Sequence, residues 1–232
     1  MNEFDNQIVL ITGAKGGLGS SVTEAYLGEG ATVIGVARSI AQADFASPRF
    51  HAMPTDLTRE ESVLALGSQV HEQFGRVDVL AHLMGGYEGG TAAAETPQSS
   101  FEKMFVMNFW PAVHLAKAFV PRMREKGKGR VLAVGARPAL EPVATLGAYS
   151  ASKAALVSLM RTLSLENKDR GITVNLILPG MMDTPANRAA MPGADFSKWV
   201  QPAKVASLAL WLTSEAASQV TGALVPMYDG GA

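Results

Sequence analysis

Tyr149 and Lys153 pair a possible proton donor with a possible electrostatic partner, four positions apart. The surrounding segment is predicted to be helical, and this spacing places both side chains on one helix face, where they can share a site. An ammonium group there would lower the pKa of the phenol from its ordinary value of about 10, so that it exchanges a proton near neutral pH. The spacing alone is also compatible with a half-buried tyrosine beside a solvated lysine.

A second pattern, near the start of the chain, has the residue types that bind a phosphate group. The segment Thr-Gly-Ala-Lys-Gly-Gly-Leu-Gly at 12–19 follows an apolar strand pattern and precedes a helical one. Its glycines Gly13, Gly17 and Gly19 allow a tight turn and close approach of the backbone to a pyrophosphate, whose charge would meet the helix N-terminus. A glycine-rich turn without a ligand is the alternative, and we favour the nucleotide site.

Strand and helix patterns alternate along the whole chain. Short β-branched apolar runs are typical of strands buried on both faces of a parallel sheet. We predict strands at 7–12, 31–37, 50–53, 77–83, 130–135, 172–178 and 223–227, and helices at 18–29, 58–74, 98–126, 147–169 and 202–214. This order predicts an α/β fold, a Rossmann-type doubly wound parallel sheet of about seven strands with helices on both faces, in a single domain over residues 1–232.

Two long loops, at 84–97 and 179–200, leave the carboxyl ends of predicted strands. Open α/β sheets bind ligands at that edge, so these loops are the expected walls of a site. The second loop is expected to form a substrate lid at about 181–200. Its apolar side chains, Met181, Met182, Met191 and Trp199, would line the site or pack the lid onto the core.

The composition excludes several classes of protein. The formal net charge is -1 with no basic run, which argues against a nucleic-acid-binding surface. The chain has no cysteine, so disulfides and thiolate metal sites are excluded, and we predict no metal. The N-terminus is acidic and no apolar stretch is long enough for a membrane span, so we expect a soluble, cytoplasmic protein without a membrane partner.

With both patterns identified, the chain resembles the short-chain dehydrogenases/reductases over its full length. Residues 12–19 and Tyr149-x-x-x-Lys153 match the paired signature of that family, and further landmarks match Asp56-Leu57, Asn108, Asn175, Leu178-Pro179-Gly180 and Asp229-Gly230-Gly231. The resemblance implies a nicotinamide cofactor, a small-molecule substrate and a homodimer or homotetramer. It implies a cofactor site formed by Gly13, Lys15, Gly17, Leu18, Gly19, Arg38, Asp56, Leu57, Lys153, Gly180 and Thr184.

The residues after the second predicted strand indicate which nicotinamide cofactor is used. Enzymes that prefer NAD usually present a carboxylate there, and this chain has Ala37-Arg38-Ser39. A guanidinium suits a 2′-phosphate, and Lys15 would add a second positive charge, so NADP(H) is favoured over NAD(H). A solvated surface arginine is the alternative for Arg38, and a turn or helix N-cap role is the alternative for Asp56.

The resemblance also assigns the catalytic roles. Tyr149 would exchange the proton that accompanies hydride transfer, and Lys153 would lower its pKa and hold the nicotinamide ribose. Asn108 would help to keep a water-linked proton path to Lys153, or would satisfy backbone groups where the helix bends ahead of Pro111. We interpret His82 as a hydrogen-bonded structural histidine, because the family needs no histidine.

One family residue is replaced. The serine that the family places about thirteen residues before the tyrosine corresponds to Ala136. This change, the Gly-Gly-Tyr-x-Gly-Gly segment around Tyr87, and the run from Asp183 to Trp199 resemble the dihydropteridine reductase branch. Those enzymes reduce a quinonoid pterin, which is already electrophilic and needs less help from a serine. That branch carries an acidic residue for NADH where Ala37 and Arg38 stand here.

The sequence therefore predicts an NAD(P)H-dependent oxidoreductase that transfers hydride to a small carbonyl, quinonoid or pterin-like acceptor. We expect Ala136, Tyr87, Met181 and Met191 to contact the substrate. The alternative is a nucleotide-binding protein of the same fold with little or no turnover, because the family serine is missing. A third possibility, a Rossmann domain without any ligand, would require both paired patterns to be accidental.

Overall fold

Seven parallel strands form one sheet in the order β3-β2-β1-β4-β5-β6-β7. This computed structural model describes residues 2–228, and Asp229, Gly230 and Gly231 lie outside the described residues. The strands are β1 (Ile8–Thr12), β2 (Thr32–Ala37), β3 (Phe50–Pro54), β4 (Val79–His82), β5 (Gly129–Val134), β6 (Ile172–Pro179) and β7 (Leu224–Met227). The order reverses between β1 and β4, which confirms the predicted doubly wound sheet and sets the position of its switch point.

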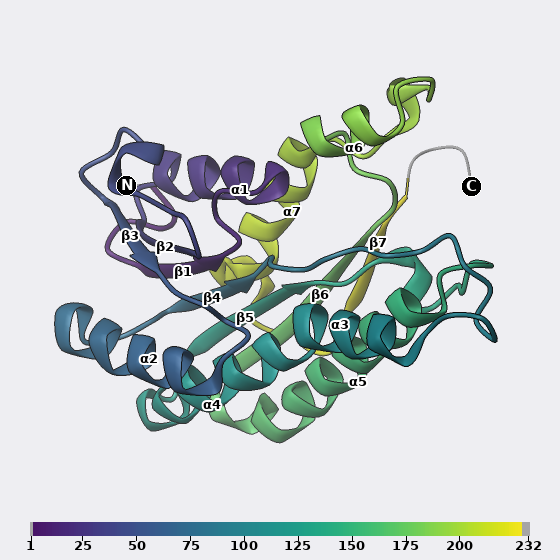
Figure 1. Ribbon diagram of the computed structural model, residues 1–232. Helices are drawn as coiled ribbons and strands as arrows, with labels where there is room; N and C mark the ends of the chain where they lie inside the picture. Colours follow the sequence, from purple (N-terminus) through teal and green to yellow (C-terminus); the bar gives the residue numbers. More distant parts are fainter. Residues whose placement is uncertain (1, 229–232) are drawn as a thin grey trace.

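Helices cover both faces of this sheet (Figure 1). α1 (Gly17–Gly28) and α7 (Pro202–Thr213) pack on one face, and α2 (Glu60–Phe74), α4 (Trp110–Lys126) and α5 (Gly147–Asn167) pack on the other, beside α3 (Gln98–Asn108). Each face has its own buried apolar cluster, one around Ile11 and Val22, the other around Leu10 and Leu156. The central strands are buried along almost their whole length, as their unbroken apolar sequence requires.

The prediction of one continuous helix over 98–126 was wrong, because this segment forms two helices. α3 ends at Asn108 and α4 begins at Trp110. Pro111 has no backbone N–H to donate to the preceding turn, so the hydrogen-bond ladder of α3 is interrupted there and a new helix begins at Trp110. The break leaves Asn108 at a helix end, close to the loop that follows β4.

The predicted lid is more ordered than a loop. It contains α6 (Pro185–Ala190) and a short 3₁₀ helix at Phe196–Lys198, and a parallel bridge between Met182 and Val200 closes its base. Thr184 caps α6 by accepting a hydrogen bond from the Asn187 amide at 3.3 Å. The ends of the other predicted elements differ from the structure by one or two residues. None of the described helices is both long and apolar enough to cross a membrane.

Candidate active site

The loops after β1 and β4 meet at the switch point of the sheet. Gly13 has φ of +70°, and a Cβ added there would lie 3.0 Å from the backbone nitrogen of Met84. A side chain at this position would therefore be strained and would push the two loops apart. At this place on the carboxyl edge of the sheet, the backbones of the two loops pack directly against each other without a side chain between them.

The glycine loop adopts the tight turn that its sequence predicts. The amide of Gly16 donates to the Gly13 carbonyl at 2.9 Å, and α1 begins at Gly17. A Cβ on Gly19 would lie 2.0 Å from the Gly13 oxygen, so this position accepts glycine only. Leu18, in the first turn of α1, is buried in the apolar cluster on that face of the sheet. The amides at the N-terminus of α1 thus face an open edge at which a phosphate can approach closely.

Three charged residues gather beside this loop, at the end of β2. The Lys15 ammonium pairs with Asp44 at 2.8 Å and donates to the Ser39 carbonyl at 3.3 Å. Arg38 is exposed in the same turn, and its charge contributes to lowering the pKa of Asp56. Because Asp44 already pairs with Lys15, Arg38 is the better placed cation for an added phosphate group.

Asp56 has the turn role that the sequence left open. Its Oδ1 accepts hydrogen bonds from the backbone nitrogen of Thr58 at 3.0 Å and from the Thr58 hydroxyl at 2.7 Å. These bonds are the main reason that its pKa lies below the ordinary value. Leu57 is fully buried in the core, and its carbonyl bonds the His114 ring at 3.2 Å. Side-chain contacts of Leu57 with a cofactor are therefore excluded, and only its backbone can take part.

Tyr149 and Lys153 project from the first two turns of α5. Lys153 is buried, and its Nζ donates to the Val134 carbonyl at the end of β5, at 3.0 Å. Burial lowers the pKa of Lys153 to about 8. Burial also raises the pKa of Tyr149 to about 12, with a further contribution from Tyr87. This direction is opposite to the lowering predicted from Lys153, because loss of solvation, and not the charge of Lys153, is the main influence on the phenol.

Asn108 connects the loop after β4 to the helix that carries Tyr149. Its Oδ1 accepts from the Gly86 amide at 2.8 Å, and its Nδ2 donates to the Gly86 carbonyl at 3.1 Å and to the Ser152 hydroxyl at 3.0 Å. Ser152 in turn donates to the Tyr149 carbonyl at 2.8 Å. The side chain is completely buried and serves this loop, not the backbone groups at the helix break.

Tyr87 and Ala136, two of the predicted substrate contacts, lie in different surroundings. Tyr87, from the loop after β4, is 67% exposed, and its ring meets the Tyr149 ring edge-on with centroids 5.2 Å apart. Ala136 is buried in extended backbone directly after β5. The short helix that follows it, Arg137–Ala139, packs against α5. The residue at 136 therefore comes directly before a segment that packs on the helix carrying Tyr149, and in this chain it has no hydroxyl.

The lid contacts the glycine loop. A Cβ on Gly17 would lie 2.8 Å from the Cβ of Thr184, which is itself buried. Met181 is 42% exposed and Met191 is partly exposed, whereas Trp199 packs inward against Phe196. Gly180, at the start of the segment, donates its amide to the Met227 carbonyl at 2.9 Å.

One set of residues that organises the lid was not predicted. Asp183 accepts two hydrogen bonds from Arg188, one of them at 2.8 Å, and a third from Gln201 at 3.0 Å. These bonds lower the pKa of Asp183 to about 2. An acidic residue five positions before an arginine, around a Thr-Pro helix start, was the available signal.

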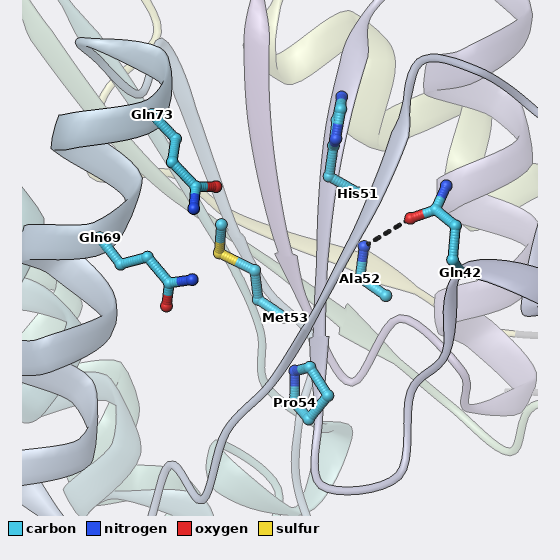
Figure 2. A pocket seen from close by; sticks show the side chains of 7 residues that line it. All are labelled: Gln42, His51, Ala52, Met53, Pro54, Gln69 and Gln73. Carbon is cyan, nitrogen blue, oxygen red and sulfur yellow. Dashed lines mark hydrogen bonds between the residues drawn. The ribbon is translucent and has the colours of Figure 1, made fainter.

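A separate cavity of about 460 Å³ lies at the outer edge of the sheet, between β3 and α2 (Figure 2). It is lined by Gln42, His51, Ala52, Met53, Pro54, Gln69 and Gln73, none of which was predicted to act. The Gln42 side chain donates to the Phe50 carbonyl and accepts from the Ala52 amide at 3.2 Å, so it covers part of the exposed strand edge. The cavity is remote from Tyr149 along the sheet and does not compete with the site at the carboxyl edge. Among residues 2–228, no group of histidine and acidic side chains could hold a metal ion.

Comparison with known proteins shows which family this chain belongs to. The family model described as short chain dehydrogenase matches residues 7–194. The 7alpha-hydroxysteroid dehydrogenase of Escherichia coli is 28% identical over 247 positions, covering 98% of this chain and 95% of that protein. The 3-oxoacyl-(acyl-carrier-protein) reductase of Salmonella typhimurium is 28% identical and is covered over 98% of both chains. The crystal structure of gox2181 is 27% identical, with a TM-score of 0.90, and the match covers 97% of this chain and 95% of that one.

Proposed function

Because the chain belongs to the short-chain dehydrogenases, we propose that it is a reductase that uses NADPH to reduce a small, flat, conjugated acceptor of the quinonoid or pterin-like class. The proposal depends on one observation above all. Ala136 is buried in the segment after β5 and has no hydroxyl, while Tyr149 and Lys153 share the start of α5 and Asn108 bonds to the same helix. This site has the proton donor Tyr149 but lacks the serine that would hydrogen-bond the substrate carbonyl. It therefore suits an acceptor that needs a proton and does not need its carbonyl polarised.

The glycine loop has the residues needed to bind the pyrophosphate of a dinucleotide. A Cβ at Gly13, Gly17 or Gly19 would enter backbone or the lid, so the loop leaves backbone amides as the surface that a pyrophosphate would meet. Gly180 and Thr184 would hold the nicotinamide end, and Lys153 the ribose. Arg38 and Lys15 would hold a 2′-phosphate. When bound, the reduced nicotinamide would supply the hydride.

Tyr149 would supply the proton. Burial keeps its phenol protonated, which is the form required of an acid. The Lys153 ammonium, anchored on Val134, stabilises the phenolate that forms as the proton leaves. Asn108 ties α5 to the loop that carries Tyr87, so that the two tyrosine rings, which contact each other edge-on, would lie on the same side of the acceptor.

The absence of a serine selects the acceptor. An isolated ketone develops an alkoxide as it is reduced, and loss of one donor to such an oxygen typically costs ~2.7–4 kcal/mol in the transition state. A conjugated quinonoid system spreads this charge over several atoms and needs the donor less. The exposed Tyr87 ring and the partly exposed Met181 and Met191 would contact a flat molecule on its faces.

The test is a rate comparison on purified protein. NADPH and NADH are each assayed against quinonoid pterins, quinones, simple ketones and imines, with Tyr149→Phe as the control for background reduction. We expect NADPH-dependent turnover of the quinonoid substrates that the control lacks. Cofactor binding without turnover of any acceptor would instead support a nucleotide-binding protein that lacks activity.

The same fold leaves a surface that suits a second subunit. Rings of Phe105, Phe109, Trp110 and His114 follow one another along α3 and α4, and Val106, Trp110 and Leu165 are substantially exposed. Burial of such side chains against a copy of the chain would favour a homodimer or homotetramer. Light scattering of the wild type and of Trp110→Glu tests this, and a wild-type monomer would refute it.

A further inference from the structure

His82 is a buried ionisable group that the proposed function leaves without a role. It ends β4 and is 3% exposed, on the face of the sheet covered by α4 and α5. In the sheet its register partners are Thr12 on β1 and Ala133 on β5. It therefore lies under the carboxyl edge, one strand away from the carbonyl of Val134 that anchors Lys153.

Thr12 determines where the imidazole proton lies. The Thr12 hydroxyl oxygen accepts hydrogen bonds from the amides of Leu83 at 3.2 Å and Met84 at 3.4 Å. A hydroxyl has two lone pairs and one proton, so its proton remains for His82 Nδ1, which lies 2.8 Å away. Nδ1 is then an acceptor, and the neutral ring carries its proton on Nε2.

The protonated nitrogen has no acceptor in the part of the protein that the structure describes. His82 Nε2 is buried and makes no hydrogen bond to any of residues 2–228. Nδ1 faces Thr12 on β1, so Nε2 points away from that contact. Buried donors of this kind normally have a partner, which in a polar pocket is often an ordered water molecule.

Lys153 is the charged group near this donor. Loss of solvation, with a smaller contribution from this ammonium, lowers the pKa of His82 to about 3, so the ring stays neutral. Lys153 has three protons, and the structure uses one of them on the Val134 carbonyl. A Cβ on Gly85, three residues after His82, would lie 3.1 Å from Lys153 Nζ, so the loop that follows His82 runs close to the ammonium.

We propose that His82 is a positioning residue for proton supply, whose Nε2–H and a Lys153 Nζ–H donate to the same buried water molecule. This proposal rests on the proposed function. The water oxygen would accept both bonds, and its own two protons would point outward along the path from solvent. After Tyr149 gives its proton to the product, the ammonium returns one proton to the phenolate and becomes a neutral amine. The water then turns one of its protons toward this amine and gives it up, and the resulting hydroxide takes a proton from solvent. The imidazole proton stays on Nε2 throughout.

Two substitutions separate this role from packing. In His82→Asn the amide oxygen can still accept from Thr12, but no donor reaches the position of Nε2. In His82→Gln the amide nitrogen lies at the position of Nε2, but the acceptor for Thr12 is lost. Proton supply predicts that His82→Gln keeps kcat within about threefold of the wild type, and that His82→Asn loses tenfold or more. A packing role alone predicts the opposite order, with His82→Gln the worse variant in both kcat and Tm.

The assay measures kcat, the solvent deuterium isotope effect and the dissociation constant of NADPH for each variant. We expect a larger solvent isotope effect in His82→Asn than in the wild type, because proton supply becomes slower, and NADPH binding within twofold in all three proteins. Equal kcat in the two variants, with an active wild type, would overturn the inference and leave the proposed function intact. A wild type without turnover on any acceptor would overturn the proposed function itself.

The tautomer can be measured without turnover. In protein labelled with ¹⁵N-histidine, His82 should show a protonated Nε2 and no titration between pH 5 and 8, and its signals are assigned by their loss in His82→Asn. Lys153→Met should raise the midpoint of the His82 titration, because the ammonium charge is removed. A proton on Nδ1, or an unchanged midpoint in Lys153→Met, would refute the shared water.

Discussion

Replacing Ala136 by serine should create reactivity toward simple ketones. Ala136 is 6% exposed, so a hydroxyl placed there would act in a site with little competing water. A preorganised donor to a developing oxyanion contributes ~2.7–4 kcal/mol, or about a hundred- to a thousandfold in rate. The new hydroxyl would rotate about its χ1 angle, because the structure has no partner built for it. We therefore expect about tenfold in kcat/KM, equivalent to about 1.4 kcal/mol.

The assay compares oxidation of NADPH by wild type, Ala136→Ser and Ala144→Ser with one simple ketone and one quinonoid acceptor. Ala144 is exposed in the following loop and serves as the matched control for the same chemical change. The ketone rate should rise in Ala136→Ser alone, and the quinonoid rate should change less than twofold. If the wild type already reduces unactivated ketones briskly, or if both rates rise together, another donor polarises the carbonyl and the argument from Ala136 is wrong.

Four further outcomes follow from the site and the lid. Arg38→Ala should weaken NADPH binding about tenfold or more and leave NADH binding nearly unchanged, and equal wild-type affinities for the two cofactors would contradict this. Tyr149→Phe should abolish turnover while NADPH still binds, whereas Lys153→Met should lower both activity and NADPH affinity; a Tyr149→Phe variant with most of its activity would mean that another group is the acid. Gly17→Ala would place a Cβ 2.8 Å from the lid, so NADPH affinity measured by fluorescence titration should fall about tenfold, and unchanged affinity would show that the lid yields freely. The pKa of Asp183 is lowered to about 2, so its hydrogen bonds stabilise the lid fully above the unfolded pKa of about 4, and this stabilisation is lost as the pH falls toward 2. Asp183→Asn should therefore make the lid sensitive to protease already at pH 7. Equal cleavage of the variant and the wild type would contradict this.

The sequence was sufficient for the parts of the molecule that local physics decides. Strands buried on both faces need unbroken apolar runs, and the helices between them need apolar residues repeating every 3.6 positions. Both patterns can therefore be recognised within a short stretch of sequence. The glycine loop was predictable for the same reason, because the conformation of Gly13 and the space at Gly19 are set within one turn. Tyr149 and Lys153 are brought to one helix face by their spacing alone.

Other features depend on contacts between residues far apart in the chain, and only the tertiary structure decided them. Asn108 bonds Gly86 and Ser152, which are 22 and 44 positions away, so its role was open until the loop and α5 were placed. The pKa of Tyr149 depends on how much solvent the assembled site removes, and burial reversed the direction predicted from Lys153. His82 was expected to be hydrogen-bonded, and it is, but its tautomer follows from Thr12, 70 positions earlier on a neighbouring strand. Side-chain hydrogen bonds between neighbouring strands leave no repeating pattern in the sequence, because the topology of the sheet determines which strands become neighbours.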